Sequence, residues 1–389
     1  MQIPHPPGAI RFSIAARDPS CSARLGTLCL PNRQVATPVF MPVGTQATVK
    51  GIMAGALNTM GYGLLLANTY HLHLRPGDEA IARMGGLHRF SGWSGAYLTD
   101  SGGYQVFSLA RLRRVEEDGI QFRSHLDGSA IMFTPEIVMR IQRNLGADIA
   151  MTFDECAPYP CDHAYARAAM ERTHRWAERC RNAHDGTTAS GGPQALFGIV
   201  QGATYRDLRE QSASFLADLE FPGYAIGGLA VGEDRETRNR CVEWCTSILP
   251  EARPRYLMGV GTPRDIVDAV CRGVDMFDCV LPTRNGRTGQ VFTSAGVLNI
   301  RNAQYAEDRG PLDPACDCAA CANHSRAYVR HLFTTHEMLG PILATHHNLS
   351  YYARLMTRIR DAILSQTLEQ LLYEIGEVYP GETLSEAVV

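Results

Sequence analysis

The chain has 389 residues, a formal net charge of −3 at pH 7 and 45% hydrophobic residues. This length can bury a large core and allows either two domains or one barrel with an appendage. The slightly negative charge argues against a generally basic coat for nucleic acid, so any RNA contact must come from a local patch. No apolar stretch approaches the roughly 20 residues that cross a bilayer, and the N-terminus MQIPHPPGAI lacks the form of a signal peptide. We therefore expect a cytoplasmic protein without membrane contact.

Eight short apolar runs end in small or polar residues and predict strands. They lie near residues 38, 63, 96, 148, 196, 223, 255 and 274. Helix-like segments separate most of them, and Thr134 with Pro135 marks the start of one. The helices are expected over 134–146, 163–183, 205–219, 234–248 and 262–272. This alternation predicts an α/β protein with a (β/α)₈ TIM barrel, whose site would lie at the carboxyl ends of the strands.

The 12 cysteines favour buried or metal-binding roles over disulfides, because a reducing cytosol keeps thiols free. Cys316, Cys318 and Cys321 form a tight C-D-C-A-A-C cluster, and His347 follows later in the chain. Three thiolates and one imidazole make the closed shell of one structural Zn²⁺. A chance cluster of free thiols is the alternative, and the adjacent His346 could be the ligand in place of His347.

Three segments depart from the alternation and are expected to decorate the barrel. Residues 11–37 are typical of short strands, 115–133 of a hairpin turning at Asp127-Gly128, and 350–373 of a terminal helix. We expect a disordered N-terminus over 1–10 and a barrel with N-terminal strands and an inserted hairpin over 11–289. A zinc-binding subdomain is expected over 290–349, and it starts with two strand-like runs. The last part, 350–389, is expected to be a C-terminal helix that packs on the barrel.

Two strand-end segments suggest chemistry on a nucleotide. In GVDMFDCVLPTRNGR (273–287), an apolar run delivers Asp278 and breaks at Pro282 into an expected loop with two arginines, which can grip phosphate. In AYLTDSGGYQVFSL (96–109), Asp100 follows a similar run, and two glycines after it let the backbone approach a ligand. A strand-end aspartate can act as nucleophile or acid/base. For either one alone, a solvated turn or a helix cap is the ordinary alternative.

Together these segments resemble the tRNA-guanine transglycosylases, the queuine tRNA-ribosyltransferase family, and most closely its bacterial branch. The likeness runs from about Arg11 to the C-terminal helix. Its further motifs are HLDGS (125–129), FDEC (153–156), GIVQG (198–202), GGLAVGE (227–233), YLMGVGTP (256–263) and the cysteine cluster. Long motifs scattered over nearly the whole chain make chance agreement very improbable.

This resemblance implies a step of queuosine biosynthesis. The wobble guanine of tRNAs with a GUN anticodon, those for aspartate, asparagine, histidine and tyrosine, would be exchanged for 7-aminomethyl-7-deazaguanine (preQ1). Asp278 matches the family's nucleophile, which would hold the RNA covalently during a double displacement, and Asp100 matches the general acid/base. A carboxylate can stabilise and then trap an oxocarbenium-like sugar, as in retaining glycosidases. The two carboxylates could instead share a proton or pair with arginines.

The family pattern also supplies a base pocket. Asp154 would accept from the amidine-like edge of guanine, Gln201 and the Gly228 amide would donate to its carbonyl, and Tyr104 and Met258 would sandwich the ring. The same pattern adds Ser101, Gly102, Gly103, Cys156, Leu229, Val231 and Glu233 to the pocket. Taken singly, each of these residues has an ordinary structural alternative, such as a cap, a bulge or a core position.

Within this pocket, Val231 and Cys156 favour preQ1, because family members that accept the bulkier queuine tend to have glycine in place of Val231. The carbonyl of Leu229 could accept from the aminomethyl group, and Glu233 would help to set that peptide.

The resemblance assigns two segments to the tRNA anticodon loop, whose poorly stacked bases are easily extruded. They comprise Gly259, Val260, Gly261, Thr262, Pro263, Arg264, Asp265, Thr283, Arg284, Asn285, Gly286 and Arg287. Arg264, Arg284 and Arg287 are the expected phosphate contacts. The family commonly forms homodimers, and residues 323–335 could meet a dimer partner or RNA.

Two other classes compete with this interpretation. His71 and His73 follow a strand with a spacing used by metal-dependent amidohydrolases on the same barrel, but the later strand ends lack the further histidines that such a site needs. A non-catalytic partner subunit could bind tRNA and zinc without chemistry. The presence of both Asp100 and Asp278 argues against it.

Overall fold

A computed structural model describes residues 10–31, 33–109 and 113–381. The expected disordered N-terminus falls outside these residues except for Ile10, which is buried. In the part of the chain that is described, no helix is both long and apolar enough to span a membrane.

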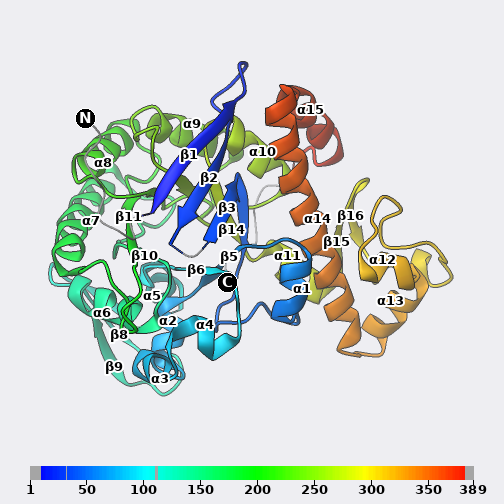
Figure 1. Cartoon of the computed structure of the whole chain (residues 1–389), viewed down its shortest axis with the longest axis horizontal. Helices are drawn as coiled ribbons and strands as arrows, with labels where there is room; N and C mark the ends of the chain where they lie inside the picture. Colours follow the sequence, from blue (N-terminus) through cyan, green and yellow to red (C-terminus); the bar gives the residue numbers. More distant parts are fainter. Residues whose placement is uncertain (1–9, 32, 110–112, 382–389) are drawn as a thin grey trace.

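Eight parallel strands form a closed barrel at the centre of the molecule (Figure 1). They are β4 (Val39–Pro42), β5 (Leu64–Ala67), β6 (Ala96–Thr99), β10 (Ile149–Met151), β11 (Ala195–Val200), β12 (Tyr224–Ile226), β13 (Arg255–Leu257) and β14 (Met276–Cys279). Their order is β4-β14-β13-β12-β11-β10-β6-β5. A parallel bridge from Val43 to Leu66, with the Gly44 N–H 2.7 Å from the Leu66 carbonyl, closes the ring. All eight expected strands and the barrel are confirmed, because strands buried on both faces appear in sequence as continuous apolar runs.

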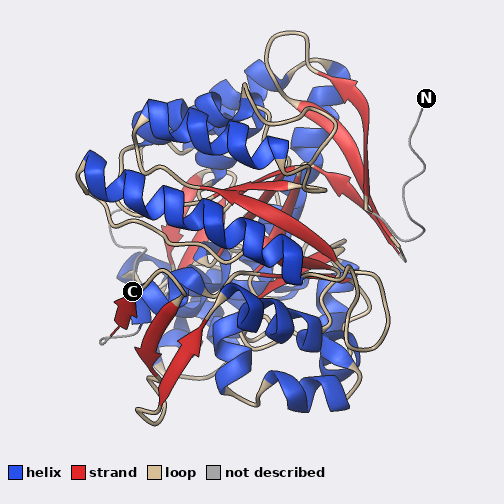
Figure 2. Cartoon of the chain, turned by 90° about the vertical axis from the view of Figure 1, so that its left-hand side faces the viewer, coloured by secondary structure: helices blue, strands red, loops and turns tan. Residues whose placement is uncertain are grey.

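Helices cover the outside of the strands (Figure 2). The five expected helices are confirmed as α6 (Pro135–Leu145), α7 (His163–Ala183), α8 (Arg206–Asp218), α9 (Arg235–Thr246) and α10 (Pro263–Cys271). Side chains that accept from backbone N–H groups fix their starts: Thr134 caps α6, Asp162 caps α7 and Asp234 caps α9. Shorter helices lie between the first strands, namely α1 (Ala54–Thr59), α2 (Thr69–Leu74), α3 (Asp78–Arg83), α4 (Gly86–Ser91) and α5 (Gly103–Leu109).

Two small antiparallel sheets decorate the barrel. The first consists of β1 (Arg11–Arg17), β2 (Arg24–Leu30) and β3 (Arg33–Thr37), as expected. The second contains the expected hairpin, β8 (Ile120–Arg123) with β9 (Ala130–Phe133), turning at Asp127-Gly128. It has a third strand that was not expected, β7 (Arg113–Val115). Gly119 makes this strand possible, because the tight turn brings its backbone against Phe133, where a Cβ would lie 2.0 Å from the carbonyl oxygen.

The C-terminal part differs from the expectation of one helix over 350–373. The described part of the chain ends in two helices, α14 (Leu339–Ser365) and α15 (Leu368–Val378). The elements before them are β15 (Gln290–Thr293), β16 (Gly296–Asn299), the 3-10 turn η1 (Ala303–Tyr305), α12 (Ala319–Asn323) and α13 (Arg326–Thr334). Gln366, at φ 60°, separates the last two helices. Helix α14 begins early because its first turns pack in the subdomain core through Leu343, while later turns join the barrel core through Tyr352. Figure 1 shows it running between the two.

Candidate active site

Asp100 and Asp278 lie at the same end of the barrel. Asp100 directly follows β6, and Asp278 lies near the end of β14. Because all barrel strands are parallel, their carboxyl ends meet at one mouth. Burial raises the pKa of Asp100, and the charge of Asp278 adds to this effect, as expected for two carboxylates at one end of the barrel.

Asp100 is buried among hydrogen-bond donors. The backbone N–H of Thr69 donates to Oδ1 at 2.8 Å, and the Gln105 amide donates to Oδ2 at 2.8 Å. The Asn68 amide also donates to Oδ2. Burial outweighs these donors and, with the charge of Asp278, raises the pKa of Asp100 to about 6. A carboxyl group with this pKa can give up and regain a proton near neutral pH.

Asp278 is held through one of its two oxygens. Tyr256 donates its phenolic proton to Oδ1 at 2.5 Å, and the Gly259 N–H donates to the same atom at 2.8 Å. Burial raises the pKa of Asp278, and it also raises the pKa of Tyr256 well above its usual value, which keeps the phenol protonated as a donor. Among the described residues no donor bonds Oδ2. Of the two carboxylate oxygens, Oδ2 is therefore the one available for a further contact.

Asp154, Ser101 and Gln201 form a connected group beside these acids. The Ser101 hydroxyl donates to Asp154 Oδ1 at 2.7 Å, and the Gln201 amide donates to Oδ2 at 2.7 Å. Burial raises the pKa of Asp154. The Gln201 Oε1 atom is buried without a hydrogen-bond partner among the described residues. The polar atoms of Asp154, Ser101 and Gln201 can therefore exchange their present hydrogen bonds for bonds to the polar edge of a flat ligand.

Two glycines allow the backbone to pass close to this group. A Cβ on Gly103 would lie 2.5 Å from the Asp154 carbonyl oxygen. Gly228 has φ +63°, and a Cβ there would lie 2.3 Å from Gln201 Oε1. Any other residue at either position would displace the polar group.

The segment after β12 is held by Glu233. Its Oε1 accepts from the Ala230 N–H at 2.6 Å and its Oε2 from the Val231 N–H at 3.1 Å. Since Ala230 N–H and Leu229 C=O belong to one peptide, Glu233 fixes the direction of the Leu229 carbonyl. The structure thus brings Glu233 to the peptide that the family pattern indicates. Cys156 is buried, and burial raises the pKa of its thiol to about 12, while Tyr104 and Met258 are half-buried.

Sequence reasoning missed several residues that hold this site. Asn68 and Gln105 bond Asp100, and Tyr256 bonds Asp278. Arg209 of α8 is fully buried, and its guanidinium donates to the carbonyls of Ala203, Gly227 and Gly228 at 2.6, 2.7 and 3.2 Å. Only Asn68 carried a sequence signal, because it ends GLLLAN, the run that predicts the second barrel strand, in the same way that Asp100 ends its own run.

The two expected RNA segments differ in structure. Residues 283–287 were expected in a loop, but they lie in the helix α11 (Leu281–Thr288). The expectation was wrong because Pro282 occupies the first turn of a helix, where its missing N–H has no partner to lose. Gly286 lets α11 press against α14, since a Cβ there would lie 2.7 Å from Thr345. Asn348 of α14 donates to the carbonyls of Pro282 and Gln290, both at 3.0 Å.

The three expected phosphate contacts have different surroundings. Arg284 and Arg287 are half-buried and form no ion pair with any residue that the structure describes. Burial and the Arg284 charge lower the pKa of Arg287, as expected for neighbouring cations without a counter-charge. Arg264 instead bonds Asp268 at 3.1 Å and lies against α15, where a Cβ on Gly376 would lie 1.7 Å from its Nη1.

In the segment 259–265, most side chains point inward. Val260, Thr262, Pro263 and Asp265 are buried, whereas Gly259 is exposed. Thr262 caps α10 by accepting from the Asp265 N–H. Asp265 is paired with arginines of α9, so its side chain is engaged inside the protein.

The cysteine cluster has the form of a zinc site. The ligand atoms of Cys316, Cys318, Cys321 and His347 all lie within 4.8 Å of one another. His347 Nε2 donates to the Phe292 carbonyl at 2.8 Å, which leaves Nδ1 facing Cys321 Sγ at 3.2 Å. This fixed tautomer suits a metal and settles the ligand as His347, since His346 lies outside the group. Four protein ligands leave no open position, so zinc at this site is structural.

The amidohydrolase alternative is not supported. His73 pairs with Asp78 at 2.7 Å, and His71 packs against the ring of His125. The two histidines therefore have different partners. In the described ranges, the cysteine cluster is the sole group of three or more ligand residues close enough to share an ion.

Fold and site define a TIM-barrel enzyme with two interacting carboxylates at the mouth and an appended Cys₃His subdomain. Sequence comparison agrees: the family described as queuine tRNA-ribosyltransferase matches residues 18–381. A relative from Caldanaerobacter subterraneus subsp. tengcongensis is 54% identical over 373 residues, covering 96% of this chain and 98% of its own. One from Thermoanaerobacter pseudethanolicus is 56% identical over 371 residues, covering 95% and 98%. Both are named queuine tRNA-ribosyltransferase. The chain belongs to this family.

Proposed function

We propose that this protein exchanges the wobble guanine of GUN-anticodon tRNAs for preQ1. The observation that carries the proposal is the pair of acids: Asp278 has an Oδ2 that no described donor bonds, and Asp100, with a pKa of about 6, lies at the same end of the barrel. Family membership supplies the substrate class.

Each half of the reaction uses both acids. In the first, Asp278 Oδ2 bonds to the ribose C1′ while the bond from C1′ to guanine breaks, and Asp100 gives its proton to the departing base. In the second, Asp100 takes a proton from the incoming base, which bonds to C1′ and displaces Asp278. Two inversions restore the original stereochemistry, and no oxidant or cofactor is consumed.

The base pocket distinguishes its ligands by hydrogen bonds. Asp154 accepts from the amidine-like edge, and Gln201 turns to donate to the base carbonyl together with the Gly228 N–H, while Tyr104 and Met258 cover the ring. The Leu229 carbonyl accepts from the aminomethyl group of preQ1, a contact that guanine cannot make. The fixed direction of this peptide supports the assignment.

For the RNA backbone, we assign the phosphate contacts to Arg284 and Arg287, because their charges have no acceptor among the described residues. Asp265 serves the proposal differently from the sequence expectation, because its ion pair with Arg238 and its bond to the Thr262 hydroxyl hold the segment 259–265 in place from inside. Arg264 is engaged by Asp268 within α10.

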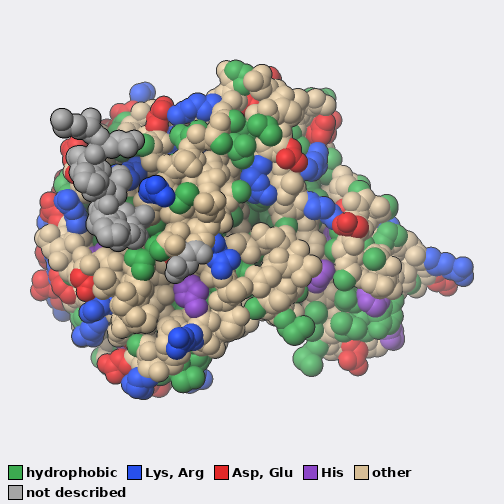
Figure 3. Space-filling model, in the orientation of Figure 1, with side chains coloured by type: hydrophobic (Ala, Val, Ile, Leu, Met, Phe, Trp, Pro, Cys, Tyr) green, Lys and Arg blue, Asp and Glu red, His purple; other side chains and the backbone are tan. Residues whose placement is uncertain are grey.

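We also propose a homodimer that works in the cytoplasm, where its tRNA substrate is found. Met53, Met338, Leu339 and Ile342 are exposed apolar side chains. They are neighbours, since a Cβ on Gly51 would lie 3.6 Å from Ile342. Figure 3 shows apolar side chains gathered on the lower side of the subdomain lobe, where a second copy could cover them.

The test is incorporation of labelled guanine into a tRNA transcript with a GUN anticodon, comparing the parent with Asp278→Asn. The asparagine Oδ1 can still accept from Tyr256 and Gly259, so the variant should fold, bind tRNA and show no exchange. Asp218→Asn, on the exposed end of α8, is the control and should exchange guanine like the parent. A parent that binds tRNA but exchanges nothing would mean a non-catalytic subunit.

A further inference from the structure

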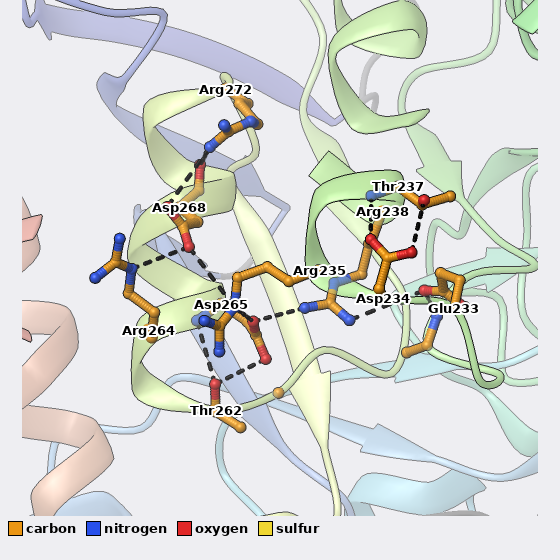
Figure 4. A network of polar contacts seen from close by, with 12 residues as sticks. Glu233, Asp234, Arg235, Thr237, Arg238, Thr262, Arg264, Asp265, Asp268 and Arg272 are labelled. Carbon is orange, nitrogen blue, oxygen red and sulfur yellow. Dashed lines mark hydrogen bonds and ion pairs between the residues drawn. The ribbon is translucent and has the colours of Figure 1, made fainter. Parts of the chain in front are cut away.

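A buried chain of ion pairs joins the base-binding segment to the segment that holds the nucleophile (Figure 4). Arg238 of α9 is its centre and is only 3% exposed. One guanidinium nitrogen lies 3.9 Å from Glu233 Oε1, and the other lies 2.6 Å from Asp265 Oδ1.

The Glu233 end sets the base-binding peptide. Both of its carboxylate oxygens accept backbone N–H groups, from Ala230 and from Val231. Ala230, between those two peptides, has φ +59°, a conformation that costs energy for a non-glycine residue. Arg238 is the cation that pairs with Glu233 among the described residues.

The Asp265 end sets the nucleophile's segment. Asp265 Oδ2 accepts from the Thr262 hydroxyl at 2.7 Å, and Thr262 is the N-cap of α10. Three residues before Thr262, the Gly259 N–H donates to Asp278 at 2.8 Å. The short stretch 259–262 therefore runs from the nucleophile to the carboxylate that Arg238 grips.

We propose that Arg238 is a positioning residue that fixes the base-binding peptide relative to Asp278 and thereby contributes to base selection. This inference rests on the proposed function. Arginine suits the role because its planar guanidinium group can face two carboxylates at once, here Glu233 and Asp265. A less firmly held Leu229 carbonyl weakens the contact to the aminomethyl group of preQ1. Binding of guanine does not change in this way, because guanine makes no contact with that carbonyl.

The experiment measures kcat/KM for preQ1 and for guanine, with KM and kcat resolved, in the parent, Arg238→Met and Arg235→Met. Arg235 is the matched control, because it bonds the same Asp265 oxygen at 2.8 Å, while its other ion pair among the described residues is with Asp268 and not with Glu233. Arg238→Met should lower the preQ1-to-guanine ratio roughly tenfold, chiefly through KM, whereas Arg235→Met should leave the ratio unchanged. General loss of stability would lower both rates together and would not move the ratio.

A double-mutant cycle checks the connection itself. Glu233→Gln removes a carboxylate charge and Thr262→Val removes a hydroxyl group, and these two groups do not touch each other. Their effects on kcat/KM for preQ1 should therefore be additive unless Arg238 couples them. We expect non-additive effects in the parent and additive effects in Arg238→Met. If Arg238→Met does not fold, Arg238→Lys replaces it, because one ammonium group cannot face both carboxylates as the guanidinium group does.

An unchanged base ratio in a folded Arg238 variant, with the parent active, would overturn the inference. Additive effects in the parent cycle would do the same. A parent unable to exchange guanine would instead remove the proposed function, so the two failures are distinguishable.

Discussion

Tyr256, on β13, donates to the same oxygen of Asp278 that accepts from the Gly259 N–H, and both bonds leave the second carboxylate oxygen unbonded among the described residues. The carboxylate of Asp278 is thus held on one side and open on the other. A carboxylate held in this way loses little freedom when it attacks, which suits the covalent intermediate that we propose.

Tyr256→Phe should slow exchange without abolishing it. The change removes one hydrogen bond to an ionised group, which corresponds to roughly a tenfold loss of kcat. Because that donor favours the carboxylate, its loss should also raise the pKa of Asp278 and shift the acidic limb of the rate profile to higher pH. Single-turnover rates from pH 4 to 8 test this, and a profile identical to the parent's would contradict it.

The two half-reactions should respond to pH in opposite directions. Asp100, whose pKa is about 6, must be protonated when guanine leaves and ionised when the new base arrives. Above this pH, kcat/KM for the RNA should fall, and kcat/KM for the incoming base should rise through the same range. Asp100→Asn should lose both inflections, whereas two limbs of the same sign in the parent would rule out the shared acid/base.

His347→Ala should lose zinc and stability, whereas His346→Ala should keep both. His347 is the buried histidine of the ligand group, whereas the half-buried His346 lies outside that group. We expect a fall in the unfolding temperature of about 5 °C or more for the first variant. Zinc content and thermal unfolding are the measurements. Full zinc occupancy in His347→Ala would reassign the ligand.

Arg287→Ala should weaken RNA binding in a salt-dependent way. Loss of one phosphate contact reduces the slope of log affinity against log salt concentration by roughly 0.7 to 0.9. Arg284→Ala should behave alike. Arg264→Ala is the control, since its guanidinium is engaged by Asp268 and α15, and its salt slope should match the parent's.

The sequence predicted the barrel well because its strands are buried on both faces and each ends where the chemistry begins. Asp100, Asp154, Gln201 and Asp278 could be found in this way. The supporting residues could not, because nothing in a sequence shows which arginine of a charged helix turns inward. Arg209 and Arg238 lie in α8 and α9 among arginines that remain at the surface.

The start of α14 was missed for a related reason. Its first turns face the subdomain and its later turns face the barrel, so the apolar stripe changes partner along one helix. In the sequence, an apolar stripe that moves to another face of the helix is easily taken for the end of the helix. The helix α11 was hidden by Pro282, which marks a helix start as readily as a chain break.

Asn348 stands next to the zinc ligand His347 and donates to one carbonyl of α11, that of Pro282, and to one of β15, that of Gln290. If Arg284 and Arg287 bind the RNA backbone as proposed, the metal site and that RNA contact share one helical turn. We then expect loss of zinc to loosen the support of α11 and to weaken the capture of tRNA before it disturbs the acids at the barrel mouth.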